Sequence, residues 1–140
     1  MPPPIYTTPP KVPPRIKAAP KHKQLYWCDL PTDAQLPEFW KCRLVVVLSY
    51  KNGLFEPCTV VPITSVPQGN NRWAYKMQTS LEAVDSWAIC NHILTVAPSR
   101  LSQHKGTIPK VTDEEFESIF SLVYQWLPNF ALKPKPAEDT

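Results

Sequence analysis

Two apolar runs that lie close together in the chain most restrict what this sequence can fold into. RLVVVLS (residues 43–49) has the highest content of β-branched residues, and CTVVPITS (58–65) follows it closely. Such residues favour strands. Asn52-Gly53 stands between the runs and is a typical two-residue turn of a β-hairpin. The sequence therefore predicts an antiparallel hairpin with its turn at this dipeptide.

The predicted turn sets a register for the hairpin. If Asn52-Gly53 forms the turn, Arg43 lies opposite Pro62. Side chains alternate between the two faces of a strand, so Arg43 and Thr64 are expected on one face as diagonal neighbours. A bulge shortly before the second run would shift this register. Pro62 cannot donate a ladder hydrogen bond, which indicates an edge or a bulge there.

The remaining expected elements are three further strands and a terminal helix. Strands are expected at 24–30, 72–78 and 87–96, and residues 31–40 are expected to form a long loop. The last element begins with Thr112 as N-cap and Glu115 three residues later, which is the capping-box pattern. Its expected apolar face consists of Phe116, Ile119, Phe120, Val123 and Leu127.

These elements show no alternation of strands and helices. Several strands followed by one helix favour a mainly β fold, an antiparallel sheet or small barrel with a C-terminal amphipathic helix. A parallel α/β fold is disfavoured.

Prolines divide the chain into a core and two tails. The 140 residues contain 18 prolines and 3 glycines. Eight of the prolines fall in residues 1–20, and such segments bury too little apolar surface to fold. We expect a basic, disordered tail over 1–21, one domain over 22–128 and a second tail over 129–140.

The N-terminal tail carries a cluster of positive charge. Five basic residues occur over 11–23, in the tail and just after it, without any Asp or Glu: Lys11, Arg15, Lys17, Lys21 and Lys23. Such a tail suits an anionic partner, or it serves only to keep the protein in solution.

Several classes of protein are disfavoured by what the sequence lacks. It has no run of 18 apolar residues and no apolar signal segment, so we expect neither a membrane span nor export. Its four cysteines show no C-x-x-C pair and no zinc-ligand spacing, which is typical of reduced core thiols in a cytoplasmic protein. No metal site and no cofactor are expected. The acid–base candidates form no recognisable constellation; they are His92, His104, Glu56, Glu82 and Asp85.

Arg43 and Thr64 form the one candidate catalytic pair. A guanidinium matches the oxygens of a phosphate, and a nearby hydroxyl adds a donor to a developing negative charge. The pair therefore suits phosphodiester chemistry without a metal. The alternative is structural: Arg43 extends to solvent at a strand end and Thr64 begins a loop.

The order of the motifs resembles that of a known family. KCRLVVVLS, CTVVPITS, WAICNHILTVAPSRL and the closing helix are together similar to the PemK/MazF toxins of type II toxin–antitoxin modules, over about residues 22–128. The resemblance implies an SH3-like barrel with a C-terminal helix, a homodimer, and neutralisation by a cognate antitoxin. It also implies growth inhibition by a metal-independent, sequence-selective endoribonuclease that cleaves single-stranded RNA.

The resemblance further implies a role for each residue of the pair. Arg43 matches the family's catalytic arginine, which binds the scissile phosphate and acts in proton transfer. Thr64 matches the Thr or Ser that stabilises the pentacovalent transition state. The RNA 2′-hydroxyl is the nucleophile, and the products carry 2′,3′-cyclic phosphate and 5′-hydroxyl ends.

Two loops supply candidate residues for RNA recognition. Stacking side chains and hydrogen-bonding amides are the residue types that read single-stranded RNA. The candidates are Phe39, Trp40, Lys41, Gln68, Asn70, Asn71, Arg72, Trp73, Asn91 and His92. The alternative for Trp40 and Trp73 is a place in the core.

The sequence departs from the family pattern at three positions. Leu44 replaces the proline that commonly follows the arginine, and Ile89 and Asn91 stand where one branch of the family has an Arg and an Asp. These departures keep other functions open. One is a non-enzymatic interaction protein on the same fold, either a gyrase poison of the CcdB type or a catalytically silent relative. Another is nucleic-acid binding by the basic tail alone.

Overall fold

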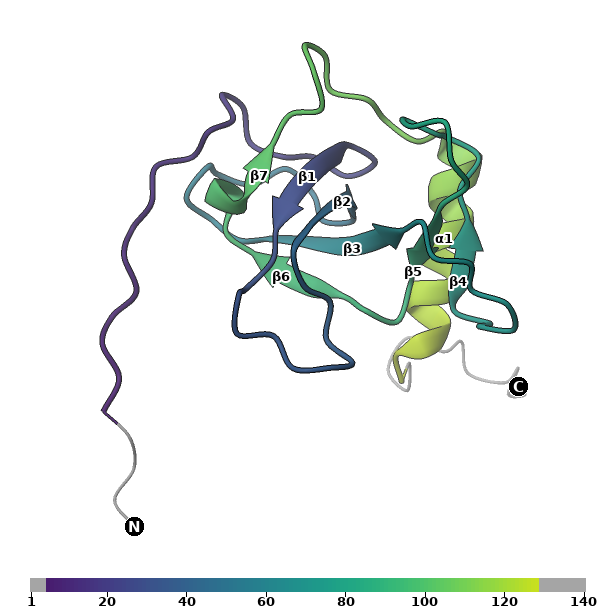
Figure 1. The fold of residues 1–140 in the computed structure, drawn as a ribbon. Coiled ribbons are helices and arrows are strands. Elements are labelled where there is room, and N and C mark those ends of the chain that lie inside the picture. The colour runs from purple at the N-terminus through teal and green to yellow at the C-terminus, as the bar shows by residue number, and fades with distance from the viewer. Residues whose placement is uncertain (1–4, 129–140) are drawn as a thin grey trace, which may run out of the picture.

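The computed structural model describes residues 5–128. Figure 1 shows a group of short strands with helix α1 along one side. The elements in chain order are β1 (Leu25–Asp29), β2 (Cys42–Val47), β3 (Cys58–Thr64), β4 (Ala74–Lys76), β5 (Trp87–Ile89), β6 (Leu94–Val96), a short 3₁₀ helix (Pro98–Arg100), β7 (Leu101–Ser102) and α1 (Asp113–Trp126).

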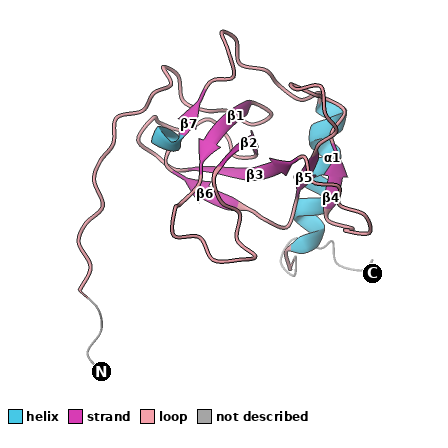
Figure 2. Cartoon of the chain, in the orientation of Figure 1, coloured by secondary structure: helices cyan, strands magenta, loops and turns pink. Residues whose placement is uncertain are grey.

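All strand pairs are antiparallel. The order across the sheet is β4-β5-β3-β2-β1-β7, and β6 also pairs with β3. Strand β3 therefore contacts three others, β2, β5 and β6, along different parts of its length. The predicted fold class is confirmed: a mainly β, antiparallel structure with one C-terminal helix (Figure 2).

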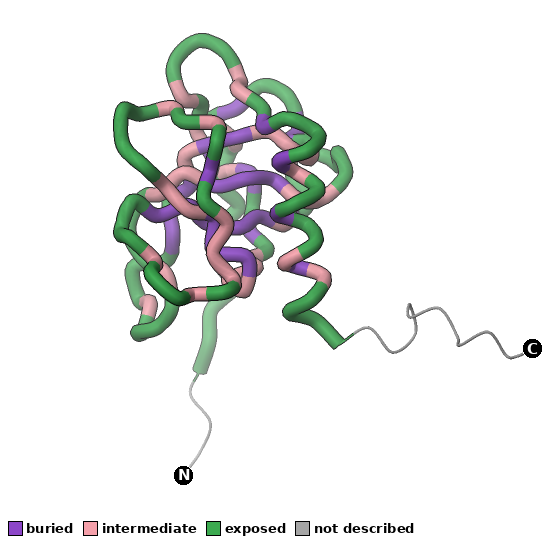
Figure 3. The backbone as a smooth tube through the Cα atoms, turned by 90° about the vertical axis from the view of Figure 1, so that its right-hand side faces the viewer, coloured by how far each residue is buried: buried purple, intermediate pink, exposed green. Residues whose placement is uncertain are grey.

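Apolar residues follow one another in β2 and β3, without alternating polar residues, because both faces of these strands are covered. One core cluster includes Tyr26, Val45 and Val60, and the other includes Val46 and Val61, together with residues of α1. Each strand contributes neighbouring residues to opposite clusters, so an alternation of apolar and polar residues would leave polar groups buried. In Figure 3 the buried segments gather beside the helix.

The hairpin between β2 and β3 forms, but its predicted turn and register are wrong. Val45 pairs with Pro62 and Val47 with Val60, which places the register two residues from the expected one. The connection is the whole segment 48–57, and Gly53 lacks the positive φ that a tight turn at Asn52-Gly53 requires. A shift of two residues leaves every side chain on its predicted face.

The strand predicted over 87–96 is two strands. A backbone hydrogen bond of 3.1 Å from the His92 N–H to the Ile89 carbonyl closes a turn between β5 and β6. Both strands then pair with β3, but at its opposite ends, with Thr64 beside Trp87 and Thr59 beside Thr95. The apolar composition of 87–96 concealed this turn.

Helix α1 begins where the capping pattern predicts. The Thr112 hydroxyl accepts the Glu115 N–H at 3.1 Å, which satisfies one of the free donors at the helix start. The Glu115 side chain does not return to Thr112, as a full capping box would require; it binds the segment after β4 instead.

The apolar face of α1 is only partly covered. Ile119 and Val123 are buried and Phe116 is half-buried, as predicted, whereas Phe120 and Leu127 are 45% and 48% exposed. Within residues 5–128, no helix combines the length and apolar character needed to span a bilayer.

The segment before β1 packs onto the barrel although the sequence assigns it to the tail. Ile16 is 4% exposed and belongs to the same core cluster as Tyr26. Arg15 forms an ion pair of 2.9 Å with Asp29 at the end of β1. The predicted tail over 129–140 lies outside the described residues.

Candidate active site

A cavity forms where β3 leaves β2. The β2–β3 pairing ends at Val45 and Pro62, and β3 then pairs with β5 through Thr64 and Trp87. Arg43 and Thr64 each lie two residues beyond this last β2–β3 pair, one on each strand. The space between the diverging strands is a cavity of about 200 Å³ that both residues line.

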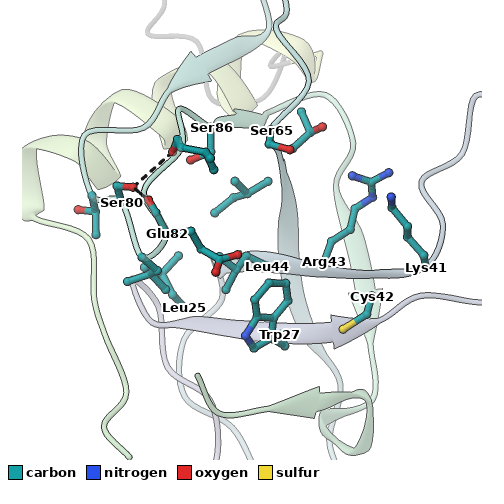
Figure 4. A pocket seen from close by; sticks show the side chains of 15 residues that line it. Leu25, Trp27, Lys41, Cys42, Arg43, Leu44, Ser65, Ser80, Glu82 and Ser86 are labelled. Carbon is teal, nitrogen blue, oxygen red and sulfur yellow. Dashed lines mark hydrogen bonds between the residues drawn. The ribbon is translucent and has the colours of Figure 1, made fainter. Parts of the chain in front are cut away.

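Four segments build the walls of the cavity, and Figure 4 shows their side chains. The lining residues come from β1, from the start of β2 with the residue before it, and from the end of β3 with the loop after β4. They are Leu25, Trp27, Lys41, Cys42, Arg43, Leu44, Ile63, Thr64, Ser65, Thr79, Ser80, Leu81, Glu82, Val84 and Ser86.

Among residues 5–128, the contacts that hold Arg43 come from the residues just before it in the chain. Its Nε donates a hydrogen bond of 3.1 Å to the Trp40 carbonyl, and its guanidinium carbon lies 4.7 Å from the centre of the Phe39 ring. These contacts fix the plane of the guanidinium and leave its two terminal nitrogens for an anion. Burial lowers the pKa of Arg43, but the group remains a cation at neutral pH.

Thr64 is 5% exposed, and its hydroxyl is oriented by the next loop. The Thr64 Oγ1 accepts a hydrogen bond of 3.2 Å from the Val66 N–H. A hydroxyl that accepts from the backbone keeps its own proton to donate. Arg43 and Thr64 therefore offer hydrogen-bond donors to one cavity, which is the arrangement that a phosphate requires.

The charges around the cavity are unequal. Lys41 and Arg43 supply two cations at one end, and Glu82 supplies the single carboxylate among the lining residues. Lys41 has a φ of 62°, a left-handed conformation that is uncommon for a residue with a side chain. Such strain often occurs at functional sites.

The long loop before β2 places its candidate residues, Phe39 and Trp40, beside Arg43. Phe39 packs between Arg43 and His92, and its ring centroid lies 4.5 Å from that of the His92 ring. His92 Nε2 is 3.0 Å from the Pro37 carbonyl oxygen. Trp40 is 51% exposed, so the alternative of a core position is wrong for this residue.

The candidates from residues 66–73 do not line the cavity. Asn71 donates to the Gln68 side chain at 3.0 Å and accepts the Trp73 N–H at 3.0 Å, which folds the loop locally. Arg72 stacks on Trp73 at 4.5 Å, and the Trp73 ring meets Trp126 of α1 edge-on. These contacts give Trp73 a packing role.

Asn70 and Asn91 also lie outside the cavity lining. Asn70 is exposed, and Asn91 is half-buried with no hydrogen-bond partner for its Oδ1 among the described residues. Asn91 stands next to His92 in the turn between β5 and β6.

Sequence reasoning missed Trp27 and the loop over residues 79–86. Trp27 pairs with Leu44, the neighbour of Arg43. Predicting that β1 pairs with β2 in this register would have identified Trp27. The loop reaches the cavity through tertiary packing alone, and no local pattern indicates this.

The cysteines are reduced, and three of them occupy the core as predicted. Cys28, Cys58 and Cys90 are buried, whereas Cys42 is exposed and lines the cavity. The prediction of core thiols is therefore wrong for Cys42. Among residues 5–128, no group of His, Cys, Asp or Glu side chains is arranged to hold a metal ion.

The architecture defines a class: a small antiparallel barrel with a C-terminal helix and an arginine–threonine pair where two strands diverge. Residues 21–126 match the sequence profile of the PemK-like, MazF-like toxins of type II toxin–antitoxin systems. The chain belongs to this toxin family. No curated protein matches the chain in sequence.

Solved structures share the fold at low sequence identity. MazF from Deinococcus radiodurans superposes with a TM-score of 0.64 at 17% identity, over 78% of this chain and 96% of that one. An endoribonuclease in complex with its cognate antitoxin, from a mycobacterial species, gives 0.58 at 17% identity over 84% and 100%. The Mycobacterium tuberculosis toxin MazF-mt6 gives 0.53 at 15% identity over 74% and 94%.

Proposed function

We propose that this protein is a metal-independent, sequence-selective endoribonuclease, the growth-inhibiting toxin of a type II toxin–antitoxin system. Its substrate is single-stranded RNA, and it acts in the cytoplasm, where mRNA is accessible. The observation that carries the proposal is that Arg43 and Thr64 line one cavity with free donors. Family membership and the fold shared with endoribonucleases support it.

The reaction is an internal transesterification. The RNA 2′-oxygen forms a bond to phosphorus as its proton leaves, and the bond from phosphorus to the 5′-oxygen breaks as that oxygen gains a proton. The products are a 2′,3′-cyclic phosphate and a 5′-hydroxyl. The terminal nitrogens of Arg43 bind the non-bridging oxygens, and the Thr64 hydroxyl donates to the charge that grows on them. As the family resemblance implies, Arg43 also takes part in the proton transfer.

Its partners follow from the family. We propose a homodimer inhibited by a cognate antitoxin, an extended segment of which occupies the RNA site. Relatives with this fold have been solved with antitoxins, namely MazE–MazF from D. radiodurans and the mycobacterial endoribonuclease.

The test combines RNA cleavage in EDTA with growth of cells that express the protein. Arg43→Ala and Thr64→Ala are expected to abolish cleavage and to restore growth while retaining the wild-type circular dichroism spectrum. Matched controls are Arg100→Ala and Thr107→Ala, because both residues are exposed and lie outside the cavity lining. Undiminished toxicity of a well-expressed Arg43→Ala protein, or accumulation of gyrase–DNA adducts without RNA cleavage, would contradict the proposal.

A further inference from the structure

The cavity extends beyond Arg43 and Thr64 to a wall that begins with an aromatic ring. Trp27 rises from β1 beside Leu44, its partner in β2, and points into the cavity (Figure 4). Its indole N–H donates a hydrogen bond of 3.1 Å to His104 Nδ1. His104 does not line the cavity, so this bond holds the edge of the Trp27 ring from outside. The face of the ring stays open to the cavity.

A carboxylate stands on the facing wall. Glu82 comes from the loop after β4 and points into the cavity above Trp27 (Figure 4). The Ser80 hydroxyl donates to the backbone carbonyl of Glu82 and, at 3.4 Å, to that of Val84. These bonds tie the backbone of the loop together on either side of Glu82, an exposed residue whose side chain lines the cavity.

The charges divide the cavity into two halves. The end with Lys41 and Arg43 attracts a phosphate, whereas Glu82 repels one. The half between Trp27 and Glu82 therefore suits the uncharged part of a nucleotide. The whole cavity has a volume of about 200 Å³, below the roughly 300–1,000 Å³ of pockets for drug-sized ligands, so it takes one ring system and not a longer segment.

We propose that Trp27 and Glu82 form a subsite for a guanine base next to the scissile phosphate, an assignment that rests on the proposed ribonuclease function. The base stacks on the Trp27 ring, as bases do on aromatic side chains in single-strand recognition. An ionised carboxylate only accepts hydrogen bonds. Guanine offers two adjacent donors, N1–H and N2–H, to its two oxygens, whereas the other bases offer one donor group on that edge.

The test measures base preference with oligoribonucleotides that differ only in the bases flanking the cut site. Wild-type protein is expected to prefer guanine, and Glu82→Gln is expected to reduce that preference about tenfold or more, because bidentate discrimination is lost. Trp27→Ala is expected to raise KM about tenfold, and Trp27→Phe to retain most of the affinity because it keeps a stacking surface. Glu56→Gln is the matched control, since Glu56 is exposed and is not one of the residues that line the cavity.

A binding experiment separates this proposal from the ribonuclease proposal. The probes are 3′-GMP and 3′-UMP, and the readout is the NMR signal of the Trp27 indole N–H, assigned by its loss in Trp27→Phe. We expect 3′-GMP to shift this signal at lower concentration than 3′-UMP. RNA cleavage with an unchanged guanine preference in Glu82→Gln overturns the subsite alone. If 3′-GMP and 3′-UMP shift the signal at equal concentrations, the guanine subsite is wrong, whether or not the protein cuts RNA.

Discussion

The Thr79 hydroxyl donates a hydrogen bond of 2.5 Å to the carboxylate of Glu115 in the first turn of α1. The same carboxylate accepts the backbone N–H of Thr79 at 3.1 Å and that of Gln78. Glu115 is 1% exposed, and its buried carboxylate is held by the segment that begins the cavity loop. Helix α1 therefore holds one wall of the candidate active site.

Replacement of Glu115 should loosen that wall. Glu115→Gln places an NH₂ group where two backbone N–H groups need an acceptor, and we expect a loss of about 1–3 kcal/mol in the free energy of unfolding. Cleavage should fall as well, because the loop over residues 79–86 loses its anchor. Urea unfolding and RNA cleavage measure the two effects. The matched control is Glu114→Gln, an exposed neighbour; equal stability of the two variants would show that the carboxylate anchors nothing.

Lys41→Gly should raise the stability of the protein and lower its affinity for RNA. Lys41 and Lys105 both have a positive φ, 62° and 65°. Glycine relieves about 1–2 kcal/mol of strain and costs about 0.4–1 kcal/mol in unfolded-chain entropy, so each Lys→Gly variant should gain roughly 0.5–1 kcal/mol. Only Lys41→Gly should lose RNA affinity, because Lys41 lines the cavity and Lys105 does not. Equal affinities, measured by fluorescence anisotropy at fixed salt, would remove Lys41 from the site.

The buried thiols should make the fold sensitive to alkali. Burial raises the pKa of Cys28 and Cys90 to about 12 and that of Cys58 to about 11, from an ordinary value of 9.0. The folded protein keeps these thiols protonated while the unfolded chain ionises them. Stability is therefore full below pH 9 and falls as the pH rises through the folded-state values, by at most about 1.4 kcal/mol per pH unit for each thiol.

Cys90→Ala tests this dependence. The variant should show a shallower fall in its free energy of unfolding between pH 9 and 11 than the wild type, whatever its stability at pH 7. Urea unfolding at several pH values gives both slopes. Parallel slopes would mean that Cys90 does not resist ionisation in the folded protein.

The exposed thiol should offer chemical access to the cavity. Burial and a hydrogen bond with Asp29 raise the pKa of Cys42, so a bulky thiol reagent should label it slowly at neutral pH and faster as the pH rises. Modification should then block cleavage, since Cys42 lines the cavity beside Arg43. Cys42→Ser should cleave RNA and resist the reagent. Full activity after complete labelling of Cys42, verified by mass spectrometry, would place the reaction elsewhere.

The sequence predicted those features that depend on local chemistry. The Thr112 cap gave the start of α1 correctly, and the β-branched runs gave β2 and β3. The hairpin register failed because Asn52-Gly53 is a strong turn signal that a ten-residue connection over 48–57 overrides. Arg43 and Thr64 nevertheless line one cavity, because a shift of two residues in the register preserves the direction of each side chain.

The rest of the site depends on contacts between distant segments. Trp27 enters the cavity through the pairing of β1 with β2, and Glu82 enters it through a loop anchored by Glu115. Neither residue has a local sequence signal for this position. The candidates Gln68 and Asn71 had the right chemistry for RNA, but their side chains bind one another and the backbone of their own loop.

We propose that Arg43 and Thr64 stabilise the phosphate while the adjacent RNA 2′-hydroxyl attacks it. This proposal is tested most directly with two oligonucleotides of one sequence, one entirely RNA and one with 2′-deoxyribose at the cut site alone, each incubated with the protein in EDTA. We predict that the RNA is cut to 2′,3′-cyclic phosphate and 5′-hydroxyl ends and that the substituted oligonucleotide remains intact. Cleavage of the substituted oligonucleotide at the same position, or products with 5′-phosphate ends, would rule out attack by the 2′-hydroxyl.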